Sequence, residues 1–172
     1  MSHGASKLRG ERVVLRQATD ADRTRLREIL AEPEVARWWA LSASTADASD
    51  DEEVQLAIEL DGTVVGAIQY AEEDDPDYRH AGVDIYLTTA VHGQGVGPDA
   101  IRTLARYLFE VRGHHRLTID PAASNARAIA AYAKVGFKPV GIMRVYERGP
   151  DGTWHDGLLM DLLRDELAAR AR

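Results

Sequence analysis

The sequence predicts one α/β (α+β) domain, in which strands and helices follow one another along a single chain. Two observations carry this prediction. Runs of alternating apolar residues flank the Asp-Gly pair at residues 61–62, which is the pattern of an antiparallel hairpin. A glycine-rich stretch at residues 92–100 then separates a strand pattern from a long helical pattern. The 172 residues can bury one substantial core, and we expect residues 1–9 and 165–172 to be flexible ends of a single domain spanning 1–172.

The N-terminal part predicts a strand followed by two helices. Residues 11–17 ("ERVVLRQ") alternate as a strand does, and residues 19–30 have the spacing of a helix with Asp20 as its N-cap. The apolar face of that helix consists of Leu26, Ile29 and Leu30. "EPEVARWW" (32–39) predicts a second, short helix that begins at Pro33.

Two adjacent tryptophans, Trp38 and Trp39, end this second helix. We expect them to pack in the core or in a lid, because large aromatic side chains bury much apolar surface. The alternative is a platform for a ligand. Both residues are therefore candidate substrate-binding residues.

The middle of the chain predicts three strands and a long helix. "VQLAIEL" (54–60) and "TVVGAIQY" (63–70) form the hairpin, and "AGVDIYLTT" (81–89) is a third strand. The glycine-rich stretch leads into a helix over residues 98–113, with a proline in its first turn and a glycine at its end. Its predicted apolar stripe consists of Ile101, Leu104, Leu108 and Val111.

The C-terminal part predicts a strand at 115–120, a helix at 124–137 capped by Ser124, and two closing strands, the last at 154–163. The complete chain then has about seven strands and about four helices. No internal repeat or low-complexity segment interrupts this order.

The charge balance excludes some partners. The formal net charge is −7, which argues against a nucleic-acid surface, because that affinity comes from Lys and Arg on phosphates. Residues 47–53 and 72–77 hold ten of the 28 carboxylates, and they are either solvated loops or an electrostatic funnel for a cationic substrate. The second run supplies three candidate substrate-binding residues, Glu72, Glu73 and Asp74.

No apolar run is long enough to span a membrane, and the N-terminus lacks the apolar centre of a signal peptide. We therefore expect a cytoplasmic protein with no membrane partner. The sequence has no cysteine, so acyl chemistry here would not pass through a cysteine thioester. The histidines show no ligand spacing, and we predict no metal.

Three glycines at alternate positions in "HGQGVGPDA" predict a cradle for an anion, because bare N–H groups and a helix start can face phosphate. A nucleoside-triphosphate P-loop needs Lys-Ser or Lys-Thr after the last glycine, and Pro98-Asp99 stands there. A dinucleotide-binding turn matches Gly95, Gly97 and Ala100. It fits the whole chain poorly, however, because an antiparallel hairpin precedes the loop.

Two motifs along the chain resemble those of the GNAT superfamily of N-acetyltransferases. The first is the pyrophosphate loop, here His92, Gly95 and Gly97, with His92 where the family usually has Arg or Gln. The second is "SNARAIAAYAKVGF", which resembles the family's Asn-x-x-Ala-x-x-x-Tyr-x-Lys-x-Gly-Phe. The matching positions are Asn125, Ala128, Tyr132, Lys134, Gly136 and Phe137.

The resemblance implies a mixed central sheet with an antiparallel N-terminal half, splayed between its fourth and fifth strands, and acetyl-CoA as co-substrate. By resemblance, the fourth strand offers backbone N–H groups to the thioester oxygen, and Tyr132 is the general acid that protonates the leaving thiolate. The implied cofactor-binding residues are Ile85, Tyr86, Leu87, His92, Gly93, Gln94, Gly95, Val96, Gly97, Pro98, Asn125, Ala128, Tyr132 and Lys134.

On the acceptor side, Asp84 lies in mid-strand, which is a costly place for a carboxylate unless it faces a site or a partner. Asp120 ends the next strand in "TIDPAASN". These two segments resemble aminoglycoside 6'-N-acetyltransferases, which implies Asp84 as base or amine binder, Asp120 as substrate residue, and a small polycationic aminoglycoside as substrate.

Other acceptors stay open. The opening "LRGERVVLRQATDAD" also resembles ribosomal-protein N-terminal acetyltransferases, and "DPAASNARAIAAY" is similar to a segment of siderophore acyltransferases. A non-catalytic acyl-CoA-binding module of the same fold is a further alternative. The oligomeric state, monomer or homodimer, is open as well.

Overall fold

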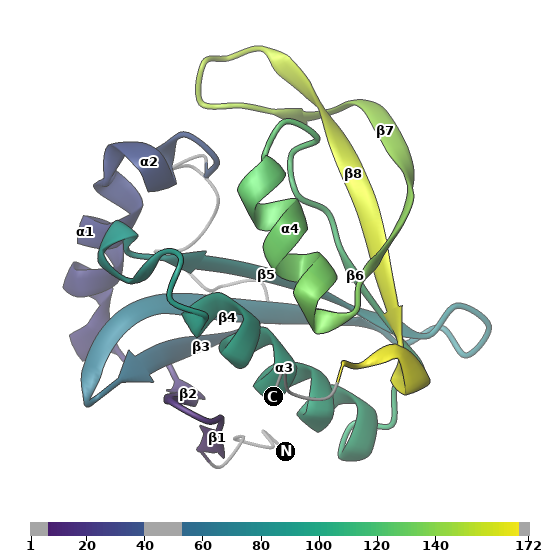
Figure 1. Ribbon diagram of the computed structural model, residues 1–172, viewed down its shortest axis with the longest axis horizontal. Coiled ribbons are helices and arrows are strands. Elements are labelled where there is room, and N and C mark those ends of the chain that lie inside the picture. Colours follow the sequence, from purple (N-terminus) through teal and green to yellow (C-terminus); the bar gives the residue numbers. More distant parts are fainter. Residues whose placement is uncertain (1–6, 40–52, 169–172) are drawn as a thin grey trace.

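A computed structural model describes residues 7–39 and 53–168 of the chain. Its centre is one mixed sheet of eight strands in the order β1-β2-β3-β4-β5-β6-β8-β7 (Figure 1). The strands are β1 Leu8–Arg9, β2 Val13–Gln17, β3 Glu53–Leu60, β4 Thr63–Glu73, β5 His80–Leu87, β6 Arg116–Ile119, β7 Lys138–Arg148 and β8 Trp154–Leu163. The helices are α1 Arg23–Ala31, α2 Pro33–Ala36, α3 Val96–Glu110 and α4 Ala126–Val135, with short 3₁₀ turns η1 Asp20–Asp22, η2 Thr89–Val91 and η3 Arg164–Glu166.

The predicted fold class is confirmed, with one strand more than expected. The additional strand is β1, whose two residues, Leu8 and Arg9, pair with β2. At the other end, the N–H of Ala168 donates to the carbonyl of Val135 at 2.9 Å, which ties the chain after β8 to the end of α4.

The N-terminal half of the sheet is antiparallel, as predicted from the hairpin. Leu60 pairs with Thr63 across a two-residue turn in which Asp61 has φ 50° and Gly62 has φ 79°. Positive φ at both central residues is the geometry that the twist of a two-residue hairpin favours, and Asp-Gly tolerates it. The local sequence therefore sets the β3–β4 register.

The sheet opens between β5 and β6. These parallel strands pair only at Ala81 with Leu117 and Gly82 with Thr118, and β6 then continues beside β8. Asp84 lies two residues beyond the last paired residue of β5, at the point where the strands part. The predicted splay between the fourth and fifth expected strands is confirmed, and it opens the sheet where a ligand can enter.

Helices cover both faces of the sheet. Leu26, Ile29 and Leu30 of α1 pack with Ala67 of β4 and Tyr86 of β5 in one cluster. The other face carries the larger core, where α3 and α4 pack (Figure 1). Alternation along β4 and β5 explains the division, because neighbouring residues on a strand point to opposite faces.

Two predicted helix details are wrong. Asp20 is the first residue of η1 rather than the N-cap of a long helix, and the turn is closed instead by Asp22, whose carboxylate accepts the Thr19 N–H at 2.8 Å. Val111 is 70% exposed because α3 ends at Glu110, so this residue falls off the buried stripe. Among the described residues, no helix is long and apolar enough to cross a membrane.

Candidate active site

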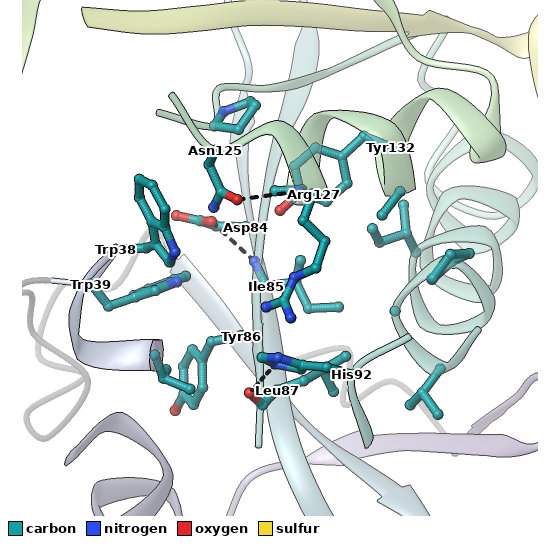
Figure 2. A pocket seen from close by; sticks show the side chains of 18 of the residues that line it. Trp38, Trp39, Asp84, Ile85, Tyr86, Leu87, His92, Asn125, Arg127 and Tyr132 are labelled. Carbon is teal, nitrogen blue, oxygen red and sulfur yellow. Dashed lines mark hydrogen bonds between the residues drawn. The ribbon is translucent and has the colours of Figure 1, made fainter. Parts of the chain in front are cut away.

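A cavity of about 1130 Å³ lies where β5 and β6 separate. The end of α2, the middle of β5, the loop after it, the first turns of α3 and α4, and the β7–β8 hairpin all contribute to its wall. Figure 2 shows Asp84, Trp38 and Asn125 at one end of the cavity and His92 with Leu87 at the other. It therefore joins the predicted cofactor loop to the predicted acceptor residues in one continuous space.

The glycine loop forms the start of α3. Gly93 has φ 72° and Gly95 φ 78°, both in the left-handed region, and a Cβ at either position would meet no atom within 4 Å. Gly95 is the N-cap residue of α3, a helix of 15 residues, so the first N–H groups of the helix have no intrahelical acceptor. Open space beside a helix start of this length suits a bound phosphate.

His92 has a structural contact that its sequence position did not predict. Its Nε2 lies 2.9 Å from the carbonyl oxygen of Leu87, the last residue of β5. The imidazole therefore fixes the glycine loop to the strand end (Figure 2).

Asp99, in the first turn of α3, binds the N-terminal segment. It is buried, and its carboxylate accepts N–H groups from Glu11, Arg12 and Val13 at 2.9–3.1 Å. The Arg12 guanidinium in turn donates to the carbonyl of Gln94 at 2.6 Å. The acidic residue that follows the glycines thus anchors the N-terminal segment, and three backbone N–H groups occupy its carboxylate.

Asp84 carries the most unusual electrostatics of the site. Its carboxylate is half-buried in the cavity wall and accepts the N–H of Ile85 at 3.0 Å, a group that we predicted to face the thioester. Burial, followed by the nearby charge of Asp120, raises its pKa to about 8. Within residues 7–39 and 53–168, Asp84 makes no ion pair. A carboxyl of this kind can exchange a proton near neutral pH.

Tyr132 lies on α4, buried against the cavity, with its ring 6.4 Å from that of Phe137. Burial, and then the charges of Asp84 and Asp120, raise the pKa of its phenol well above the usual range. The phenol is therefore protonated at neutral pH, where it can donate a hydrogen bond or supply a proton.

The start of α4 differs from the prediction by one residue. Asn125, rather than Ser124, is the N-cap, and its side-chain oxygen accepts the N–H of Ala128 at 3.2 Å. The predicted cofactor residue Asn125 thus has a capping role as well. Ala128 and Lys134 line the same side of the cavity, as does Arg127, which sequence reasoning missed and which extends from α4 toward β5 (Figure 2).

Trp38 and Trp39 combine packing with a place in the cavity wall. Arg37 stacks over the Trp38 ring, with 4.8 Å from its guanidinium carbon to the ring centroid. Trp39 meets Tyr86 edge to face at 4.9 Å between centroids. The two predicted alternatives, packing and ligand platform, are therefore compatible.

The acidic run at 72–77 does not line the cavity, so the structure does not place the predicted substrate-binding residues Glu72, Glu73 and Asp74 in the candidate site. Glu72 and Glu73 pair with the first residues of β5, whereas the glycine loop follows its last residue. The carboxylate of Glu72 is also engaged by Arg112 at 2.8 Å and His114 at 2.7 Å, which together hold its pKa below its usual value.

Of the other acidic run, 47–53, only Glu53 lies within the described residues, and it lines the cavity. Asp120, after β6, lines it too and accepts a hydrogen bond from the phenol of Tyr146 at 2.6 Å. Tyr146 and its neighbour Glu147 belong to β7 and were not predicted as site residues. No group of three or more potential metal ligands occurs in the part of the chain that the structure describes.

The sequence of the chain was compared with protein families and with known proteins. Residues 12–138 match the model of the acetyltransferase (GNAT) domain. An aminoglycoside N(6')-acetyltransferase type 1 from Klebsiella pneumoniae is 29% identical over 164 residues, covering 81% of this chain and 79% of the relative. A kanamycin resistance protein from Rhizobium radiobacter is 37% identical over 84 residues, covering 48% and 72%.

Solved structures agree on the fold. RimJ of Mycobacterium smegmatis, in complex with CoA-disulfide, superposes with a TM-score of 0.81 at 23% identity, covering 95% of this chain and 88% of that one. The aminoglycoside acetyltransferase AAC(6')-Ib, in complex with coenzyme A, superposes with a TM-score of 0.72 at 25% identity, covering 90% and 96%. The chain belongs to the GNAT family of acetyltransferases.

Proposed function

We propose that the protein transfers the acetyl group of acetyl-CoA to the 6'-amine of aminoglycosides, directly, within a ternary complex. The family supports acetyl transfer, and relatives that bear the name aminoglycoside N(6')-acetyltransferase support the acceptor. The absence of cysteine from the sequence agrees with transfer that does not pass through a cysteine acyl-enzyme.

The cofactor end of the cavity suits a pyrophosphate. Left-handed glycines at 93 and 95 leave open space beside the start of α3, and the imidazole of His92 fixes the loop to β5. Lys134 and Arg127 on α4 add positive charge to the wall. When bound, acetyl-CoA supplies the thioester, whose carbonyl carbon is attacked by the amine nitrogen as the C–S bond breaks.

The single observation that carries the acceptor proposal is Asp84. Asp84 lies at the point where the sheet opens and makes no ion pair with any residue in 7–39 or 53–168. With a pKa of about 8, its ionised form can attract an ammonium group and take its proton near neutral pH. An aspartate with its usual pKa would be a far weaker base for this purpose. Asp120, close enough to act on Asp84, adds a second attraction for a cationic acceptor.

At the other side of the reacting centre, Tyr132 supplies a proton to the departing thiolate. Its phenol is protonated at neutral pH, as an ordinary tyrosine is, and burial raises its pKa further. The amine nitrogen loses its second proton as the amide forms, and that proton restores the phenol. The net products are the amide, the free thiol of CoA and one proton.

Release of the CoA thiol by the purified protein tests this proposal. The acceptor panel is aminoglycosides, peptides with a free N-terminus and hydroxylated lysine derivatives. We expect thiol release with aminoglycosides. Turnover confined to the peptides would assign the enzyme to protein N-terminal acetylation, and turnover confined to the lysine derivatives would assign it to siderophore chemistry.

A further inference from the structure

The β7–β8 hairpin contains an irregularity beside the acceptor end of the cavity. Met143 pairs with Gly157 and Glu147 pairs with His155, so three residues of β7 stand opposite the single residue Asp156 of β8. The surplus residues form a bulge over Arg144, Val145 and Tyr146. Bulges of this kind are common beside active sites, where they change the direction of a side chain.

The backbone of this bulge is strained. Val145 has φ 51°, which a β-branched residue rarely adopts because its side chain crowds the backbone. The conformation is held by Asp156, whose carboxylate accepts the Val145 N–H at 2.8 Å. A local conformation that costs free energy, fastened by a specific hydrogen bond, indicates that the direction it gives to the next residue matters.

That next residue is Tyr146. Its ring lies against Gly157, where a Cβ would come within 2.9 Å of the Tyr146 Cδ1, so only glycine leaves room for the ring. Its phenol reaches across to Asp120 and donates at 2.6 Å. Two backbone hydrogen bonds, from Leu158 to Pro121 and from Ala123 to Asp156, hold the segment after Asp120 against β8.

We propose that Tyr146 is a positioning residue of the acceptor site, aimed by the β7 bulge so that its phenol orients the Asp120 carboxylate toward the substrate ammonium. The proposal rests on the proposed function, in which Asp120 attracts the acceptor. A carboxylate has several acceptor positions, and a donor on one oxygen fixes the plane in which the others face the cavity. The phenol remains a donor, since its hydrogen bond to Asp120 and burial raise its pKa to about 12.

A positioning role predicts a change in acceptor binding without a change in chemistry. With neamine as acceptor, Tyr146→Phe keeps the ring against Gly157 but removes the hydrogen bond, so KM should rise by about tenfold while kcat stays within about twofold. The matched control is Tyr78→Phe, which removes the same atom from a tyrosine that is 74% exposed in the β4–β5 turn. KM and kcat should be unchanged in the control.

Two further variants test whether Tyr146 acts through Asp120 and the bulge. In an Asp120→Ala background, Tyr146→Phe should have little further effect on KM, because the phenol has lost its partner. Asp156→Ala should raise KM like Tyr146→Phe, although Asp156 does not line the cavity, because the bulge loses its anchor. Additive effects of the Asp120 and Tyr146 substitutions, or an unchanged KM in Tyr146→Phe, would overturn the proposal. A Tyr146→Phe variant in which both kcat and the melting temperature fall would also overturn the proposal, because that pattern indicates a structural role.

Calorimetric titration with neamine separates this inference from the proposed reaction. A parent protein that binds neamine about tenfold more tightly than Tyr146→Phe, yet does not acetylate it, keeps the positioning role and overturns the reaction. A parent that acetylates neamine but binds it as tightly as the variant does overturns the inference alone. A parent that neither binds nor acetylates neamine overturns both.

Discussion

The carboxylate of Glu32 accepts the hydroxyl of Thr88 at 2.6 Å, and it also accepts the N–H and hydroxyl of Thr89 at 2.8 and 2.7 Å. Glu32 lies between α1 and α2, and the two threonines follow β5 directly. The Glu32 side chain therefore joins the α1–α2 segment, which precedes Trp38 and Trp39, to the end of β5, which precedes the glycine loop.

Glu32→Ala should lower the free energy of unfolding by about 2 kcal/mol, because Thr88 is buried and its hydroxyl would lose its acceptor. Urea denaturation measures this. The matched control is Glu28→Ala on α1, an exposed residue whose ion pair with Arg25 is 3.6 Å long and should contribute little. Equal losses in the two variants would show that the contact does not hold the elements together.

Gly95→Glu should abolish acetyl-CoA binding, because a carboxylate would stand in the open space beside the start of α3. Gly62→Glu is a close control: Gly62 has φ 79° against 78° for Gly95, and a Cβ at either glycine meets nothing within 4 Å. Both variants carry the same backbone strain and charge, but Gly62 lies in the β3–β4 turn. Calorimetry should find affinity lost in the first and kept in the second, and equal affinities would refute the phosphate cradle.

Tyr132→Phe should lower kcat by about 10²-fold, the range usual for a general acid, while the affinity for acetyl-CoA changes little. The phenol is the proposed proton donor to the thiolate, and the buried ring is retained in the variant. Steady-state kinetics and a binding titration together measure the two quantities. A kcat within twofold of the parent would assign Tyr132 to packing only.

Asp84→Asn should stabilise the fold, increasingly as the pH rises from about 5 to about 8. The pKa of Asp84 is raised by burial and then by Asp120, so the folded state holds a proton that the unfolded state has released in this range. The parent therefore loses stability as pH rises through the folded pKa, and Asn, which does not titrate, avoids that loss. The difference in the free energy of unfolding between Asp84→Asn and the parent should grow by about 2 kcal/mol over these three pH units. This is half of the value expected for full proton linkage, because water reaches the cavity.

Urea denaturation at several pH values measures this difference. A stability difference between Asp84→Asn and the parent that is independent of pH would mean that Asp84 ionises normally, and it would remove the argument for Asp84 as a base near neutral pH.

Much of the fold could be predicted because its signals are local. The Asp-Gly turn defines the hairpin, and the glycines before α3 predict the left-handed loop at the start of that helix, since each position needs a backbone conformation that glycine adopts readily. Asp84 could be singled out as a candidate because a carboxylate inside an apolar strand needs a functional or electrostatic reason.

The remaining site residues depend on tertiary geometry. The run at 72–77 was assigned to the substrate from its charge alone, and charge does not reveal which end of β5 it adjoins. Tyr146 and Glu147 were missed because nothing in "RVYERGPDGTW" marks a bulge, and a β-branched residue such as valine is rarely expected at a positive φ. The contact of Glu32 with the end of β5 spans more than fifty positions and has no local pattern.

Acetylation of a 6'-amine is tested most directly by comparing neamine with paromamine as acceptors. The two compounds differ at one group, a 6'-amine in neamine and a 6'-hydroxyl in paromamine, so they present the same remaining amines to Asp84 and Asp120. With acetyl-CoA, we expect CoA thiol release with neamine and a kcat/KM lower by at least about 10²-fold with paromamine. Equal kcat/KM values for the two compounds, or no release with neamine, would contradict the account.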